Sequence, residues 1–253
     1  MAGSVQLLAD IEDAGQEAFV IQTPSARYVY HKEGGGFRRL IDRDERDWIG
    51  YGPGGGPAGE YRGIPNMVFR GDQGGFFHPG HTGTRASSTE LLGDEPEAVS
   101  LLTTSCNDRW QVRWDIFATY ARMTVLRVDA EDPEYWLLYE GTPGGGFDPD
   151  RSLCLRSSGE STPLTEPWET ELPDPNWVGF TDPDRENCLV LRCRLSEACP
   201  AMYKAMEPMT VFGFGRELRG VSSFLRDAGS RLCVGLVKGA THESIGTAVQ
   251  EWK

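Results

Sequence analysis

Apolar and polar residues alternate with a period of two along much of this chain, which is the pattern of half-buried β-strands. The clearest case is the run WQVRWDIF at 110–117, where Trp110, Val112, Trp114 and Ile116 fall on one face. A second alternating run follows at 120–130, and a shorter one lies at 25–32. These runs predict strands that bury one face and expose the other.

Other apolar runs of strand length are bounded by glycine, proline, asparagine or aspartate, as strands usually are. These runs lie at 5–13, 17–23, 86–94, 96–106, 133–140, 188–195, 209–214 and 232–239. Residues 37–51 predict a hairpin with its tip at 43–46. We therefore expect many short antiparallel strands joined by turns.

Three segments do not follow the strand pattern. Residues 142–187 are predicted to be mostly turn and loop, and residues 197–208 to form one short helix. Residues 241–252 predict a C-terminal helix with Thr241 as its N-cap. No internal repeat and no linker divides the chain, so the expected architecture is all-β: one large antiparallel β-sandwich domain over residues 1–253 with few short helices.

The composition is that of an ordinary globular protein, with 39% hydrophobic and 25% charged residues among 253. The net charge of −13 argues against a nucleic-acid or anionic-membrane partner, because a phosphate backbone needs a basic surface. No signal peptide and no membrane span is visible, so we expect a cytoplasmic protein or one whose leader has been removed. The six cysteines match no zinc signature and are expected to be free thiols.

The densest group of chemically useful side chains lies in the glycine- and proline-rich segment 60–84. Loops on a rigid scaffold are where binding and catalytic residues concentrate. Histidine titrates near neutral pH and moves protons, and arginine holds carboxylates through paired hydrogen bonds. The candidates in this segment are Tyr61, Arg62, Asn66, Arg70, His78 and His81. Simple exposure or a structural role is the alternative for each of them.

Further candidates lie on strands or at strand ends. Glu140 follows Tyr139 and opens into a glycine turn, and Arg216 ends a later strand. Charged residues between aromatic side chains also suit a sugar, whose ring has apolar faces and whose hydroxyls accept hydrogen bonds; these are Arg113, Asp115 and Arg122. His31 and His242 are weaker candidates. No cofactor is predicted, because no dinucleotide or serine-hydrolase motif is present. A divalent metal at the two histidines is an open alternative but is not predicted, since the HPGH spacing matches no zinc signature.

Three segments near the N-terminus resemble the opening of the galactose-mutarotase-like β-sandwich proteins. They are GGGFRRLIDRDERDWIGY, YRGIPN and FHPGHTG. The later segments YARMTVLRV, WLLYEGTPGGG and MTVFGFGR resemble an uncharacterised bacterial group associated with polysaccharide breakdown, so the resemblance spans about 25–240. It implies a supersandwich fold and a carbohydrate ligand. On the epimerase pattern, His78 and His81 would be acid and binder and Glu140 the base.

The leading hypothesis from the sequence is a lyase that cleaves a uronic-acid-containing poly- or oligosaccharide by β-elimination. Arg62 or Arg113 would neutralise the carboxylate, and His78, His81 or Tyr61 would exchange the protons. The alternatives are a sugar epimerase, a glycoside hydrolase using carboxylates such as Asp115 and Glu140, and a non-catalytic carbohydrate-binding module. The oligomeric state is not predicted.

Overall fold

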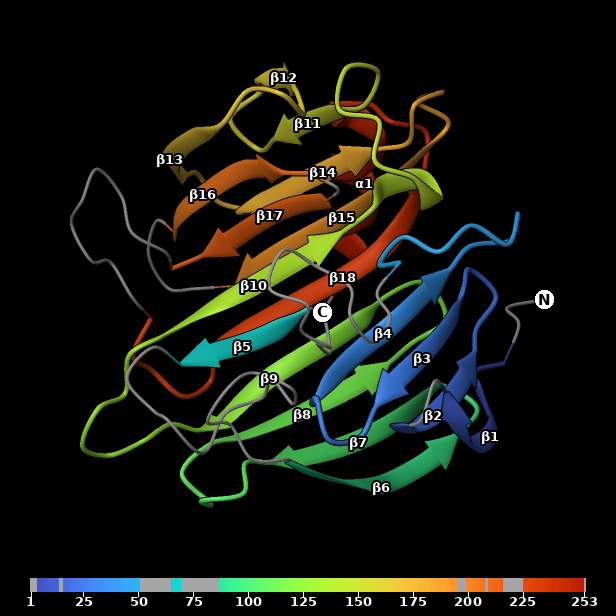
Figure 1. Cartoon of the computed structure of the whole chain (residues 1–253), viewed down its shortest axis with the longest axis vertical. Helices are drawn as coiled ribbons and strands as arrows, with labels where there is room; N and C mark the ends of the chain where they lie inside the picture. Colours follow the sequence, from blue (N-terminus) through green and yellow to red (C-terminus); the bar gives the residue numbers. More distant parts are fainter. Residues whose placement is uncertain are drawn as a thin grey trace.

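The structure, a computed structural model, describes residues 4–13, 16–50, 65–69, 87–194, 199–207, 209–215 and 225–252, except the side chains of Gln16, Phe69 and Cys199. The described chain forms three antiparallel sheets in two layers (Figure 1). A four-stranded and a five-stranded sheet lie side by side and make up what we call the front layer. A nine-stranded sheet, the back sheet, lies behind both. The predicted all-β sandwich is confirmed.

Strand order defines the layers. The four-stranded sheet runs β1 (Gln6–Asp13), β2 (Gln16–Gln22), β3 (Arg27–His31) and β4 (Gly36–Ile41). The five-stranded sheet runs β13 (Trp168–Leu172), β16 (Cys199–Met206), β17 (Met209–Phe214), β10 (Tyr135–Gly141) and β5 (Asn66–Phe69). The back sheet runs β12 (Ser161–Pro163), β11 (Leu153–Arg156), β14 (Trp177–Thr181), β15 (Asn187–Arg194), β18 (Arg231–Lys238), β9 (Ala121–Arg127), β8 (Gln111–Ile116), β7 (Ala98–Thr104) and β6 (Ser88–Glu95).

Aromatic side chains fill the space between the layers. Phe37 of β4 meets Trp114 of β8 with ring centroids 4.7 Å apart, and Tyr139 of β10 meets Phe180 of β14 at 5.5 Å. Each of these four rings is at most 1% exposed. Burying one such side chain stabilises a fold by roughly 1.5–3 kcal/mol. These contacts fix the inward faces of β4 and β10.

The C-terminal helix α1 (His242–Glu251) packs on the outer face of the back sheet through Ile245 and Val249. Thr241 caps it: its hydroxyl accepts a 3.1 Å hydrogen bond from the Ser244 amide. The predicted helix and its cap are both confirmed. No helix in the described part of the chain is long and apolar enough to cross a membrane.

Two expected segments differ from the structure. Residues 199–206 form β16 instead of a helix, because Ala201 and Tyr203 enter the core while Met202 and Lys204 face the other way. Alanine, methionine and lysine favour helices, but pairing with β13 and β17 overrides that weak preference. The expected loop at 142–187 contains four strands, β11 to β14, each only three to five residues long. Such short runs show no clear period.

Two groups of hydrogen bonds join the two front sheets. At the first, the Asn66 side-chain amide donates to the Gly34 carbonyl at 2.8 Å. At the second, the Trp48 carbonyl accepts from the Tyr139 hydroxyl at 2.9 Å and from the Thr142 amide at 3.2 Å. We call these two groups the seam. They hold β5 and β10 of one sheet against the β3–β4 hairpin and the end of the four-stranded sheet.

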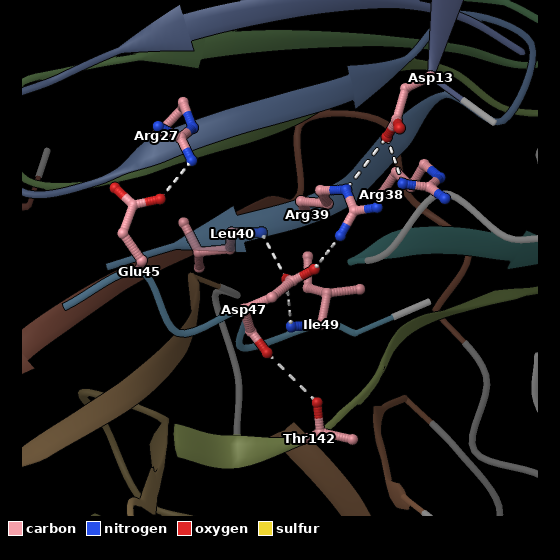
Figure 2. A network of polar contacts seen from close by, with 9 residues as sticks. All are labelled: Asp13, Arg27, Arg38, Arg39, Leu40, Glu45, Asp47, Ile49 and Thr142. Atoms are coloured by element: carbon pink, nitrogen blue, oxygen red, sulfur yellow. Dashed lines mark hydrogen bonds and ion pairs between the residues drawn. The ribbon is translucent and has the colours of Figure 1, made fainter. Parts of the chain in front are cut away.

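Asp47 organises the second group (Figure 2). Its carboxylate accepts hydrogen bonds from the amides of Leu40 and Ile49 and from the Arg39 guanidinium, at 3.1–3.2 Å. Its carbonyl accepts from the Thr142 hydroxyl at 3.3 Å. One aspartate thus closes the hairpin after β4 and binds the end of β10.

Gly141→Ala tests the seam. An added methyl group would lie 2.5 Å from the Tyr139 hydroxyl and 2.6 Å from the Trp48 carbonyl oxygen. We expect the free energy of unfolding to fall by about 1–3 kcal/mol, a loss of roughly 3–9 °C in Tm. The control is Gly246→Ala in α1, where nothing lies within 4 Å and helix propensity favours alanine. Equal Tm values for the two variants would contradict the close packing at the seam.

Candidate functional site

Glu140 is the described carboxylate best placed for chemistry. Along β10, Tyr139 packs against Phe180 of the back sheet, so alternation turns Tyr135, Leu137 and Tyr139 toward the space between the layers and Trp136, Leu138 and Glu140 toward the front, where Leu138 is also buried. Glu140 is 5% exposed and lies directly opposite Val211 of β17. A carboxylate that is nearly buried in the middle of a sheet costs free energy to desolvate.

Asn66 shares this face. It pairs with Leu138, two residues before Glu140 on the neighbouring strand, so the two side chains are diagonal neighbours at roughly 7–8 Å. Asn66 is fully buried, and the Oδ1 atom of its side chain accepts a hydrogen bond from the Met67 backbone amide at 2.7 Å. Together with its bond to Gly34, this fixes the orientation of the side chain. The structure therefore brings together two of the predicted site residues.

A buried polar cluster lies on the front face of the four-stranded sheet, on the same side of the sandwich as Glu140. His31 ends β3 and projects to the same face of the sheet as Val29, and Arg38 occupies a bulge in β4. His31 and Arg38 are each at most 3% exposed. Asp13 forms ion pairs with Arg38 and with Arg39 (Figure 2). Burial and the charge of Arg38 lower the pKa of His31 to about 3, against a smaller opposing effect of Asp13. His31 is therefore neutral at neutral pH.

Sequence reasoning undervalued this cluster. His31 was a weak candidate because it ends a strand, and Arg38 was not a candidate. One signal was available: two arginines separate Phe37 from Leu40, whereas inward residues of a regular strand are two positions apart, and the structure has its bulge there. What the sequence could not show is that the front face of this sheet is buried at His31.

Arg113, Asp115 and Arg122 lie elsewhere. They project from the outer face of the back sheet, because their neighbours in the strands enter the core: Trp114 lies between Arg113 and Asp115, and Met123 follows Arg122. Asp115 accepts hydrogen bonds from Ser100 at 2.7 Å, Arg113 at 2.8 Å and Arg122 at 2.9 Å. The structure thus separates these three candidates from Glu140 by the full thickness of the core.

Burial raises the pKa of the Asp115 carboxyl, but hydrogen bonds from Ser100, Arg122 and Arg113, together with the charge of Arg113, outweigh it and hold the pKa below its usual range. Asp115 is therefore ionised at neutral pH, and its negative charge is stabilised by the hydrogen bonds from Ser100, Arg113 and Arg122. This arrangement explains Asp115 as a stabilising residue of the back sheet.

Tyr139 is also placed away from the front. Its ring is 1% exposed in the core, its hydroxyl donates to Trp48, and burial raises its pKa well above the usual value. A ligand at Glu140 lies on the opposite side of β10.

The other candidates fall outside the described residues and remain predictions: Tyr61, Arg62, Arg70, His78, His81 and Arg216.

Among the described residues, no group of three or more His, Cys, Asp or Glu side chains is arranged to hold a metal ion. Cys154, Cys188, Cys193 and Cys233 are buried free thiols. Burial raises the pKa of Cys154 to about 12 and that of Cys233 to about 11, so neither is a nucleophile at neutral pH.

Solved structures share this fold over most of their length. A proposed mutarotase from Salmonella typhimurium (YeaD) has a TM-score of 0.56 at 10% identity, covering 92% of this chain and 94% of that one. A galactose mutarotase related enzyme from Lactobacillus acidophilus has a TM-score of 0.54 at 9% identity, covering 88% and 98%. A proposed aldose 1-epimerase from Klebsiella pneumoniae has a TM-score of 0.57 at 9% identity, covering 98% and 85%.

The fold is galactose-mutarotase-like. The resemblance seen in the N-terminal segments is confirmed for the fold. The comparisons show nothing of a group associated with polysaccharide breakdown. No protein-family model and no curated protein matches the sequence.

Asp115→Asn tests the network on the back sheet. A charge-assisted network is lost, so we expect the free energy of unfolding at pH 7 to fall by about 1–3 kcal/mol. Because the pKa of Asp115 is lowered in the folded protein, its contribution is complete above about pH 4 and disappears as the pH falls through the folded pKa. Urea unfolding at pH 7 and pH 3 measures this. The exposed Asp150→Asn is the control, and a deficit equally large at pH 3 would contradict the assignment.

His31→Gln tests the buried histidine. Between its ordinary pKa of 6.5 and its folded pKa of about 3, the unfolded chain binds a proton that the folded protein excludes. Stability contributed by neutral His31 is thus complete above pH 6.5 and falls on acidification, by roughly 2 kcal/mol between pH 7 and pH 5. The variant should show a shallower fall over this range. Parallel curves for wild type and His31→Gln would refute the buried neutral state.

Proposed function

We propose that this protein is a sugar epimerase that interconverts the anomers of an aldose, with Glu140 as general base. The observation that carries the proposal is the position of Glu140, a carboxylate nearly buried on the front face of β10, beside a fixed Asn66. The names of the structures with the same fold, a galactose mutarotase related enzyme among them, support this reaction class.

The chemistry needs one base and one acid. The base takes the proton of the C1 hydroxyl, the bond between C1 and the ring oxygen breaks, and the acid gives a proton to that oxygen. Rotation about C1–C2 in the open aldehyde and reversal of the same steps yield the other anomer. Glu140 takes the first proton, and His78 and His81 remain the predicted acid and sugar binder.

The other hypotheses from the sequence fare less well. A glycoside hydrolase using Asp115 and Glu140 needs carboxyl groups roughly 5–10 Å apart across one sugar. These two side chains point away from each other on the outer faces of two layers, whose backbones alone are about 10 Å apart. A lyase finds no support in the names of the three similar structures. A non-catalytic sugar-binding module remains the alternative from another class.

Glu140→Gln is the decisive variant. Freshly dissolved α-anomers of neutral aldoses would be followed by polarimetry, and anomer exchange at equilibrium by NMR. Removing a general base should slow the exchange by about 10²–10⁴-fold, while sugar binding and thermal unfolding stay close to wild type. Glu171→Gln, an exposed glutamate on β13, is the matched control.

Full activity in Glu140→Gln would refute the assignment of the base. A wild-type rate equal to that of buffer with every aldose, together with tight sugar binding, would favour the binding module. Ultraviolet absorbance appearing with a uronate-containing polysaccharide would restore the lyase.

A further inference from the structure

Two arginines lie directly opposite each other on the outer face of the back sheet. Arg194 ends β15, Arg231 begins β18, and the two are paired in the antiparallel register of these strands. Both side chains project outward, because the residues next to them, Cys193 and Leu232, enter the core. Directly opposed residues have Cβ atoms about 4.5–5.5 Å apart. The two guanidinium groups can therefore reach one and the same ligand.

The charges of this pair are not neutralised within the described part of the chain. Arg194 and Arg231 are exposed, and their side chains form no ion pair or hydrogen bond with any described residue. Arg113 and Arg122 on the same face, by contrast, share the carboxylate of Asp115. Like charges directly opposite each other destabilise a sheet. Without an anion, the pair therefore lowers the stability of the fold.

Further positive charge surrounds the pair. Two neighbouring cross-strand rows over β15, β18, β9, β8 and β7 carry five arginines and one acidic residue: Arg194, Arg231, Thr124, Arg113 and Leu102 in one row, and Arg192, Cys233, Arg122, Asp115 and Ser100 in the other. Glu90 ends the first row on β6, at the far edge of the sheet. Burial raises the pKa of the Cys233 thiol, and the charges of four arginines, Arg194 and Arg231 among them, oppose that rise. In a chain with a net charge of −13, these rows form a local positive surface.

The charge and spacing of the pair suit a phosphate group better than a carboxylate. Each guanidinium presents a fork of N–H donors that matches the oxygens of either group. A carboxylate carries a single charge, and one fork is enough to bind both of its oxygens. A phosphate monoester carries a charge of about −1.5 to −2 at pH 7 and has three acceptor oxygens. It can therefore accept hydrogen bonds from both forks and balance both positive charges.

We propose that Arg194 and Arg231 together bind a phosphate group on the outer face of the back sheet. Thr124, directly opposite Arg231, places a hydroxyl beside the pair as a further donor. The site lies on the other side of the sandwich from Glu140, so it goes beyond the proposed function and does not depend on it. A free phosphate ion and a phosphate ester share the chemistry that the pair recognises.

Calorimetry at low ionic strength tests the proposal and needs no turnover. The ligands are inorganic phosphate and glycerol 2-phosphate, with acetate as the singly charged reference. The wild type should bind at least one of the phosphates tighter than acetate by about tenfold or more, and Arg194→Gln or Arg231→Gln should remove about tenfold or more of that affinity, since hydrogen bonds to a charged group are lost. Tighter binding of the ester identifies an esterified ligand, and tighter binding of inorganic phosphate identifies the free ion.

Thermal unfolding is the second measurement. Either glutamine variant removes a contact between like charges, so its Tm in phosphate-free buffer should exceed that of the wild type by roughly 1–3 °C. Added phosphate should raise the Tm of the wild type more than that of the variants, because a ligand stabilises only the state that binds it. Arg151→Gln is the matched control: Arg151 is exposed and pairs with Asp184 in the turn before β15, at the opposite end of that strand from Arg194. This variant should bind phosphate like the wild type.

Three results would overturn the inference. The first is phosphate binding that is no tighter than acetate binding, or that is unchanged in both glutamine variants. The second is an equal loss of binding in Arg151→Gln, which would reduce the effect to net charge. The third is a lower Tm of both glutamine variants in phosphate-free buffer, which would mean that the fold itself uses these guanidinium groups. Loss of anomer exchange in Glu140→Gln leaves each of these measurements unaffected, so the two proposals fail separately.

Discussion

The Trp48 carbonyl at the seam is the contact on which the front of this molecule depends. It accepts hydrogen bonds from the Tyr139 hydroxyl and the Thr142 amide, which lie on either side of Glu140 and Gly141 in the sequence. The contact leaves no room for a side chain at Gly141. Because Tyr139 is held from the core side, Glu140 must face the front. The contact that joins the two sheets therefore also orients the candidate base.

Each outer face of the sandwich carries one nearly buried carboxylate among the candidate residues, Asp115 on the back sheet and Glu140 on the front layer. On the back sheet, Asp115 is surrounded by Ser100, Arg113 and Arg122, so its charge is satisfied within the fold and stabilises it. On the front, Glu140 is 5% exposed, lies opposite Val211 and is a diagonal neighbour of the buried Asn66.

Local pattern predicted the strands whose inward and outward residues differ, such as β8 and β9, and the helix with its cap at Thr241. It could not predict β16, where pairing with two neighbours overrides helix propensity, or the short strands β11 to β14. For the candidate site, a strand end followed by glycines singled out Glu140, which the structure places nearly buried beside Asn66. The alternating run of aromatic and charged residues also singled out Arg113, because alternation assigns residues to a face but does not say which sheet carries that face or what lies across from it.

That limitation has a physical origin. Whether two polar residues share a surface depends on strand order, and β16, β17 and β10 become neighbours only through contacts between residues far apart in the chain. Lys204 and Glu140 are 64 positions apart, and register alone sets them in one row. A shift of one residue in either pairing would turn one of the two side chains into the core. The buried rings of Tyr139, Phe212 and Tyr203 prevent such a shift. The aromatic core therefore determines which side chains reach the front face of this sheet.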